Sequence, residues 1–184
     1  MNDHKYVNSA DVNGARQPAS PAAAPSPDGY DPASVELIEL LFFAYRDFVS
    51  APDEVLARQS FGRAHHRVLH FVTRNPGLSV AELLDILKIT KQSLARVLRE
   101  LIAKGHVEQR ETERDRRKRL LFATAKGRAL ALELAGLQSR RINGALAGMA
   151  PGTRHAAREF LYAMIEADDR PTVRRLLGAA GAGP

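Results

Sequence analysis

Cysteine is absent from this chain of 184 residues. Disulfides, thiolate metal sites, cysteine nucleophiles and thiol-based redox sensors are therefore excluded. No apolar run approaches the roughly 18 residues that a membrane-spanning helix needs, and the opening stretch MNDHKYVNSADVNG lacks the apolar core of a secretory signal. The sequence also lacks a glycine-rich phosphate loop and any serine or carboxylate pair in a recognisable catalytic setting. We therefore expect a cytoplasmic protein that is neither an enzyme nor bound to a membrane.

Hydrophobic residues make up 45% of the sequence, which is enough for a folded core, and the formal net charge at pH 7 is +6. An excess of positive charge favours a polyanionic partner, nucleic acid before a membrane surface. Many soluble proteins are basic, so the positions of the basic residues are more informative than the net charge.

The two ends of the chain have the composition of disordered segments. Residues 1–32 are rich in Ala, Pro, Ser, Asn and Asp, and residues 178–184 read GAAGAGP. Neither segment can bury enough apolar area to offset its ordering entropy. Between them we expect a mostly α fold with one small β-hairpin, divided into an N-terminal helix with a linker (33–60), a central domain (61–124) and C-terminal helices (125–177).

Apolar spacing and capping residues define the expected elements. Pro52 is expected to limit the first helix, Ser79 and Glu82 form a capping box, and Thr90 and Thr124 are candidate N-caps. The expected helices are 33–49, 61–74, 80–87, 91–104, 125–149 and 153–167, with strands at 106–111 and 118–124 and one further helical turn at 173–177.

A short helix, a tight turn, a second helix and a basic hairpin follow one another here in the order of a winged helix-turn-helix. The second helix carries one apolar face, formed by Leu94, Val97, Leu98 and Leu101. In this motif the exposed first turn of that helix enters the major groove, where Gln can pair with adenine and Arg with guanine. The residues expected to contact bases or phosphates are Lys91, Gln92, Ser93, Arg96 and Arg99.

The expected hairpin has a dense set of charged side chains at its tip. One arginine at a wing tip can enter a narrow minor groove, where the negative potential is enhanced. The alternative is a charged loop in solvent. The candidate contacts at the tip are Arg114, Asp115, Arg116 and Arg117.

From about Leu37 to Ala167 the chain resembles the MarR family of bacterial regulators. The segments that carry the resemblance are Ser79-Val80-Ala81-Glu82-Leu83, Ser93-Leu94-Ala95-Arg96-Val97-Leu98-Arg99-Glu100-Leu101 with Lys104-Gly105, and Asp115-Arg116-Arg117 with Thr124-Ala125-Lys126-Gly127. Of these, Asp115-Arg116-Arg117 is similar to the family's wing motif, an Asp and an Arg separated by one residue.

The resemblance implies roles for these segments. Arg117 would be the minor-groove residue and Asp115 its orienting partner. The first helix and the last two would interlock as a helical dimerisation domain, so that a homodimer reads an inverted-repeat operator in double-stranded DNA. The chain departs from many relatives at Arg99 and Glu100, where the two charges are exchanged, so family roles do not transfer to these two residues.

Many regulators of this family bind a small molecule between the dimerisation and DNA-binding parts. In this chain, His66 and His70 share a helical face, and the first helix offers Phe43 and Arg46. Aromatic walls with a few cationic groups suit a small aromatic acid or phenolic compound, hydroxynicotinate-like or benzoate-like. We therefore expect a repressor that such an effector releases.

Three alternatives stay open. The histidines could make ordinary hydrogen bonds or face solvent, and the aromatic residues could belong to the core. His66 and His70 could bind a metal, although their helix has no acidic residue, and we predict no metal site. The domain could also be a winged-helix module for protein interaction without sequence-specific DNA binding, although protein contacts do not require so many arginines at a wing tip.

Overall fold

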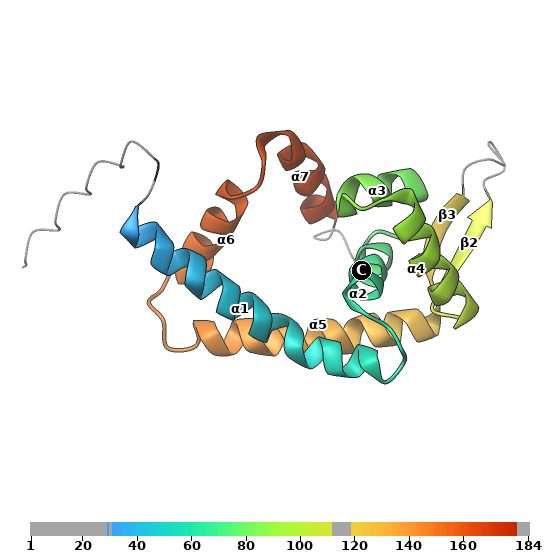
Figure 1. Cartoon of the computed structure of the whole chain (residues 1–184), viewed down its shortest axis with the longest axis horizontal. Coiled ribbons are helices and arrows are strands. Elements are labelled where there is room, and N and C mark those ends of the chain that lie inside the picture. Colours follow the sequence, from blue (N-terminus) through green and yellow to red (C-terminus); the bar gives the residue numbers. More distant parts are fainter. Residues whose placement is uncertain (1–28, 30, 112–118, 180–184) are drawn as a thin grey trace, which may run out of the picture. The chain divides into compact units, whose positions relative to one another are not determined.

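The computed structural model describes residues 29, 31–111 and 119–179, and its contacts divide the chain into two units, Met1–Leu40 and Leu41–Pro184. Helix α1 (Pro32–Ala57) starts in the first unit (Figure 1). Its start is set by Asp31, whose carboxylate accepts hydrogen bonds from the amides of Ala33 at 3.1 Å and Ser34 at 3.2 Å. Pro32 follows this cap at the first helical position, where a proline loses no hydrogen bond. The part of the predicted N-terminal arm before residue 29 lies outside the described residues.

The prediction that Pro52 limits the first helix is wrong, because α1 continues to Ala57. Pro52 itself is buried, and Leu56, one turn later, is fully buried in the core of the second unit. A proline inside a helix removes one backbone hydrogen bond. The burial of Leu56 offsets that loss, and nothing in the local sequence shows it.

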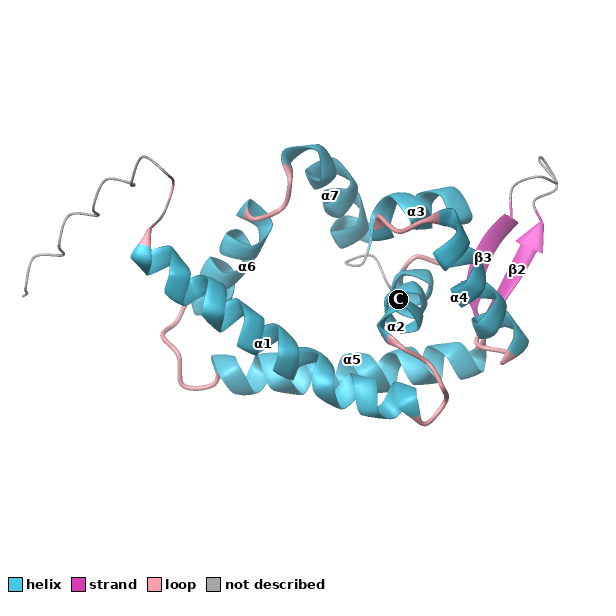
Figure 2. Cartoon of the chain, in the orientation of Figure 1, coloured by secondary structure: helices cyan, strands magenta, loops and turns pink. Residues whose placement is uncertain are grey.

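The central domain has the predicted order of elements and one additional strand. Its strands form an antiparallel sheet of order β1-β3-β2. Figure 2 shows β2 and β3 side by side. The short strand β1 pairs Leu78 with Leu121 and was not predicted. The elements are α2 (Arg63–Arg74), β1 (Leu78–Ser79), α3 (Val80–Leu87), α4 (Lys91–Ala103), β2 (Val107–Glu111) and β3 (Arg119–Ala123).

The capping predictions for this domain are confirmed. Ser79 and Glu82 bond reciprocally, with the Ser79 amide donating to the carboxylate at 2.9 Å and the Glu82 amide to the hydroxyl at 3.3 Å. The Thr90 hydroxyl accepts from the Ser93 amide at 3.1 Å. Gly105 has a φ of 72° and ends α4. These local bonds fix where α3 and α4 begin and where α4 stops.

The core of the second unit lies between α2, the apolar face of α4, the sheet and the first half of the next helix, α5 (Ala125–Leu146). All four residues of the predicted apolar face of α4 are buried, with Leu94 and Leu101 fully inaccessible. On α2, Val68, Leu69 and Val72 are buried, whereas Ala64 is exposed. Because this apolar face is buried, only the opposite side of α4 is accessible to a partner.

The C-terminal part contains three helices and a short 3-10 turn. These are α5 (Ala125–Leu146), α6 (Thr153–Ala163), η1 (Ala167–Asp169) and α7 (Arg170–Ala179). Helices α5 and α6 end earlier than predicted, and the expected turn at 173–177 is a ten-residue helix. Gly178 and Ala179, predicted to be part of a disordered tail, belong to α7.

Helix α7 is tied to α3 by charged side chains. Lys88, the C-cap of α3, pairs with Asp169 at 3.0 Å, and Arg175 approaches Glu82 at 3.8 Å. Both ends of α3 therefore have a contact from the C-terminal segment, one from Asp169 of η1 and one from Arg175 of α7. Within the described ranges, no helix combines the length and the apolar character that crossing a membrane requires.

Candidate functional site

The exposed side of α4 carries the polar residues predicted to meet DNA. Its opposite face is buried against α2 and the sheet, so the accessible side chains are those off the apolar stripe. Thr90 is the N-cap of the first turn of α4, and its hydroxyl also donates to the Ser93 hydroxyl at 2.9 Å. The residues exposed on this side are Lys91, Gln92, Ser93, Arg96 and Arg99.

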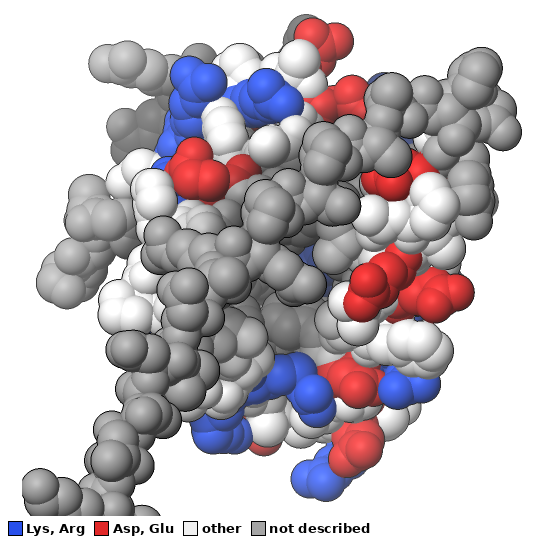
Figure 3. Space-filling view, turned by 90° about the vertical axis from the view of Figure 1, so that its left-hand side faces the viewer, with Lys and Arg blue, Asp and Glu red and all other residues white. Residues whose placement is uncertain are grey.

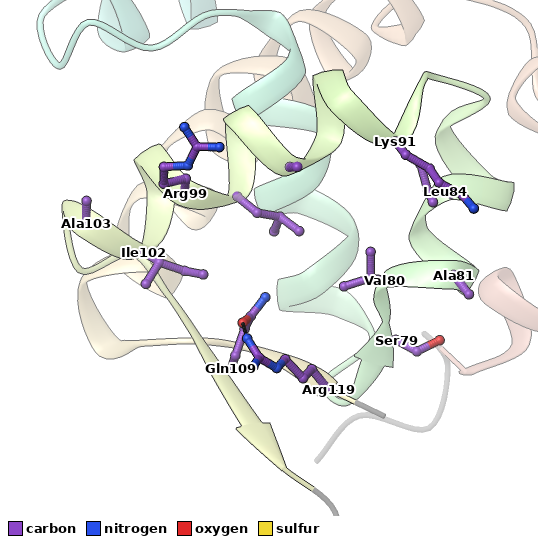
Figure 4. A pocket seen from close by; sticks show the side chains of 12 residues that line it. Ser79, Val80, Ala81, Leu84, Lys91, Arg99, Ile102, Ala103, Gln109 and Arg119 are labelled. Atoms are coloured by element: carbon purple, nitrogen blue, oxygen red, sulfur yellow. Dashed lines mark hydrogen bonds between the residues drawn. The ribbon is translucent and has the colours of Figure 1, made fainter. Parts of the chain in front are cut away.

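A groove of about 1070 Å³ runs between α4, the start of α3 and the hairpin strands. Figure 4 shows Gln109 and Arg119 side by side on adjacent strands, facing Ile102 of α4 across the groove. The Arg119 guanidinium donates to the Gln109 side-chain oxygen at 3.4 Å. Arg99 lines the α4 side of the groove. Helix α4 and the hairpin strands therefore border one basic, partly apolar groove.

The base of the hairpin is held by Arg110. Its guanidinium lies 4.4 Å from the centre of the Phe122 ring on β3 and donates to Glu108 through Nε at 3.0 Å. These contacts stiffen the strands that carry the tip. The predicted tip residues lie outside the described residues: Arg114, Asp115, Arg116 and Arg117.

Figure 3 shows the side that lies to the left in Figure 1, and on the described residues visible there basic and acidic side chains are interspersed. No single-sign surface forms among them. The exposed basic side chains of α4 and of the hairpin strands therefore remain the candidate surface for a polyanion.

A second cavity, of about 470 Å³, lies between α1, α2 and α5 within the second unit. His66 and His70 line it, as the sequence suggests. Phe43 and Arg46 do not: Phe43 is exposed, and Arg46 lies over its ring at 5.1 Å while pairing with Asp47 at 2.8 Å. The full lining is Tyr45, Phe48, Val49, Arg63, His66, Arg67, His70, Phe71 and Gln138.

Electrostatics favour the neutral form of both cavity histidines. Burial lowers the pKa of His66, against a smaller opposing effect of Asp53. Burial also lowers the pKa of His70, and the nearby His66 and Arg74 lower it further. A neutral imidazole offers one donor and one acceptor. The permanent positive charge at this cavity therefore comes from Arg63 and Arg67.

Arg63 contacts Tyr45, which also lines the cavity, and Asp53, which lies beside it. Its Nε lies 2.8 Å from Oδ2 of Asp53, and its guanidinium lies 5.7 Å from the centre of the Tyr45 ring.

The described part of the chain contains no group of three or more His, Cys, Asp or Glu residues able to hold a metal ion.

Several site residues escaped the sequence-based interpretation. Gln109 and Arg119 line the first groove because strand pairing brings them opposite α4, and Gln138 reaches the second cavity from α5, far along the chain. The alternation of sides in the strands was a usable signal for Gln109. No local signal existed for Gln138.

Two comparisons with known sequences find similar proteins. The sequence model of the MarR family matches residues 60–118. The chain is 46% identical over 138 residues to the HTH-type transcriptional regulator PetP of Rhodobacter capsulatus, covering 75% of this chain and 81% of the relative.

Two solved structures share the fold at low sequence identity. One is a putative MarR family transcriptional regulator from Listeria monocytogenes complexed with a 26mer DNA, with a TM-score of 0.62, 21% identity, and coverage of 75% of this chain and 93% of the other. The second is Bordetella bronchiseptica BpsR, whose DNA binding is described as regulated by 6-hydroxynicotinic acid. It has a TM-score of 0.55, 23% identity, and coverage of 70% of this chain and 98% of the other.

Proposed function

Since this chain belongs to the MarR family of winged-helix, DNA-binding transcriptional regulators, we propose that it is a homodimeric repressor. In this proposal it reads an inverted-repeat operator and is released from it by a small aromatic acid or phenolic compound. A repressor bound to chromosomal DNA works in the cytoplasm, where we place it.

One observation carries the dimer: large apolar side chains are exposed along the terminal helices. On α1, Phe42 is 68% exposed and Phe43 57%; on α6, Phe160 is 51% and Leu161 57% exposed. Helix α6 has no buried residue at all. Apolar rows of this extent are normally covered by a partner. A second copy related by a two-fold axis would cover both copies alike.

The two-fold axis also sets the geometry of the operator. Two copies of α4 would enter successive major grooves about 34–36 Å apart. Gln92 and Arg96 would contact base edges, whereas Lys91 and Arg99 would contact phosphates. In the wing, Arg117 would enter the minor groove and Asp115 would orient it by a charge-assisted pair.

The effector would occupy the 470 Å³ cavity lined by α1, α2 and α5. Arg63 and Arg67 supply positive charge for a carboxylate, Tyr45 and Phe48 supply aromatic walls, and the neutral His70 supplies a hydrogen bond. BpsR, which shares the fold, is described with a hydroxylated pyridine carboxylate of this chemistry. These features support an anionic aromatic effector.

Selection of duplex DNA from a random pool tests the proposal, together with light scattering of the free protein. We expect a dimer mass at micromolar concentration and an enriched inverted repeat. The selected duplex should be released by 6-hydroxynicotinate or benzoate at concentrations where calorimetry shows binding. A monomer mass, or a pool without enrichment, would contradict the dimeric operator-binding function and would favour a protein-interaction module. Binding of DNA with no response to either acid would contradict the effector class alone.

A further inference from the structure

The recognition helix α4 is tied to the start of α2 by a buried histidine. Nε2 of His65 lies 2.7 Å from Oε2 of Glu100, and the His65 side chain is only 10% exposed. These residues are 35 positions apart in the sequence. The contact joins the helix that reads DNA to the helix that lines the 470 Å³ cavity.

The hydrogen bonds around His65 define the tautomer of its ring. The backbone amide of Gly62 donates to Nδ1 at 3.1 Å, so Nδ1 has no proton. The proton of the neutral ring is therefore on Nε2, and Nε2–H donates to the Glu100 carboxylate. His65 thus serves as the N3 acceptor that caps α2 and as the donor that holds α4.

Aromatic and cationic neighbours keep the ring in place. Phe61 stacks on His65 with ring centres 4.7 Å apart, and the Lys104 ammonium lies 4.6 Å from the centre of the Phe61 ring. Lys104 also donates to the Gln59 carbonyl oxygen. Glu100 on α4 therefore contacts the first turn of α2, and Lys104, the C-cap of α4, contacts the segment before it.

Helix geometry connects this anchor with the DNA-reading residues. Gln92, Arg96 and Glu100 are spaced four residues apart, so they lie along one row of α4. Gln92 and Arg96 are exposed, and Glu100 is half-buried at the point where the row reaches α2. The buried apolar face of α4 already limits the rotation of the helix about its axis. The bond at Glu100 adds a polar constraint at the last member of the row, and so restricts further the directions in which the first two members point.

We propose that Glu100 is a positioning residue, which acts through the Nε2–H of His65 and together with the apolar packing sets the exact rotation of α4, and so contributes to how well the protein discriminates its operator from other DNA. This role rests on the proposed operator-binding function. It also gives a reason for a carboxylate on a helix that faces a polyanion, where electrostatics alone disfavours it.

The test compares Glu100→Ala, Glu100→Gln and His65→Glu with the wild type, on duplex DNA selected by the wild type and on random duplex DNA. Glu at position 65 can still accept from the Gly62 amide, but its carboxylate has no proton to donate to Glu100, so the variant retains the cap and loses the tether. We expect Glu100→Ala and His65→Glu each to weaken binding to the selected duplex roughly tenfold, with little change on random DNA. Glu100→Gln retains an acceptor and should stay close to the wild type. The double variant His65→Glu with Glu100→Ala should lose no more than either single change.

Glu111→Ala is the matched control, because it removes an exposed carboxylate from β2 of the same domain. If only the removal of a negative charge matters, Glu100→Ala and Glu111→Ala should both bind DNA as well as the wild type or more tightly. Glu100→Ala that behaves like Glu111→Ala would overturn the proposal. If Glu100→Ala fails to fold, His65→Glu provides the same comparison.

Nitrogen-15 NMR of the imidazole rings supplies a readout that does not depend on DNA. With the His65 signals assigned by their loss in His65→Glu, we expect a protonated Nε2 and an unprotonated Nδ1 at pH 8. A protonated Nδ1 would overturn the tether itself. A wild type that selects no sequence would instead end the proposed operator-binding function while leaving the tether intact, so the two failures are distinguishable.

Discussion

The backbone carbonyl of His106 lies directly against Gly127, in the space that a Cβ atom at position 127 would need. The same carbonyl accepts a hydrogen bond from the Thr124 amide at 3.1 Å, and the Thr124 hydroxyl caps the Gly127 amide at 3.0 Å. The start of α5 is thereby locked onto the end of α4. Glycine is required here by a close approach between two backbones.

We therefore expect Gly127→Ala to lower the free energy of unfolding by at least about 1–3 kcal/mol, because neither backbone can move away without breaking the cap. Urea denaturation followed by circular dichroism measures the effect. Gly136→Ala on the same helix is the matched control. Its Cβ would meet only the end of the Arg140 side chain at 3.6 Å, so it should be neutral or stabilise by about 0.5–1 kcal/mol. Equal effects of the two changes would refute the close approach.

Acid should destabilise the protein through His106. This side chain is 1% exposed, and its ring nitrogens have no hydrogen-bond partner among the described residues. Burial lowers the pKa of His106, with Lys126 and Lys104 adding to the effect. The unfolded chain therefore binds a proton near pH 6.5, where the folded protein does not. The stabilisation is complete above that pH and decreases as the pH falls, by at most about 1.4 kcal/mol per pH unit.

Urea midpoints between pH 7.5 and 5.5 measure this slope in the wild type and in His106→Leu. The variant should be less sensitive to pH. It should keep a residual slope, because burial lowers the pKa of His66 and His70 as well. If the two proteins lose stability in parallel, His106 does not contribute to the pH dependence.

Local signals predicted the starts of three helices well. The capping box at Ser79 and the caps at Thr90 and Thr124 were readable, because each is a bond between residues only three positions apart. The apolar spacing of α4 also identified its buried face, since burial follows the helical period.

What the sequence did not reveal depends on contacts between distant residues. Strand β1 has only two residues, too few for a periodicity, and exists because Leu78 pairs with Leu121. Helix α1 passes Pro52 because a core assembled from other elements buries Leu56. The bond between His65 and Glu100 likewise joins two helices that no local pattern relates.

The cap of α4 can be tested without DNA. Thr90→Ala removes the hydroxyl that accepts from the Ser93 amide at 3.1 Å. We expect a loss of about 0.5–2 kcal/mol in the free energy of unfolding, the usual cost of deleting such a cap. Thr90→Ser retains the acceptor and should restore most of it. Thermal denaturation of both variants provides the comparison, and a serine variant as unstable as the alanine variant would exclude the hydrogen bond as the cause.

Gln92→Ala and Arg96→Ala should each reduce the discrimination between the selected operator and random DNA by about 1–3 kcal/mol. Both side chains are exposed, so stability should not change. Lys91→Ala is the contrasting variant: it should weaken binding to all sequences alike and lower the salt dependence by about one phosphate contact. Fluorescence anisotropy over a range of salt concentrations separates the two kinds of contact, and a uniform loss for Gln92→Ala would reassign that residue to phosphates.

The wing gives the last prediction. Its strands are held by Arg110 between Glu108 and Phe122, and the tip residues Asp115 and Arg117 lie outside the described residues. Arg117→Ala should weaken operator binding by about 1–3 kcal/mol. The loss should be larger on operators with A·T-rich flanks, because a narrow minor groove concentrates the negative potential that attracts a guanidinium.

Asp115→Ala separates the three explanations of this tip. If Asp115 orients Arg117, removing the carboxylate weakens binding, although the variant loses a negative charge that faces a polyanion. If only net charge matters, the same change strengthens binding. If the tip is a charged loop in solvent, neither Asp115→Ala nor Arg117→Ala has a measurable effect. Anisotropy at one fixed salt concentration decides among them, because the sign for Asp115→Ala differs in each case: tighter binding would reject the orienting pair, and an unchanged Arg117→Ala would reject the minor-groove contact.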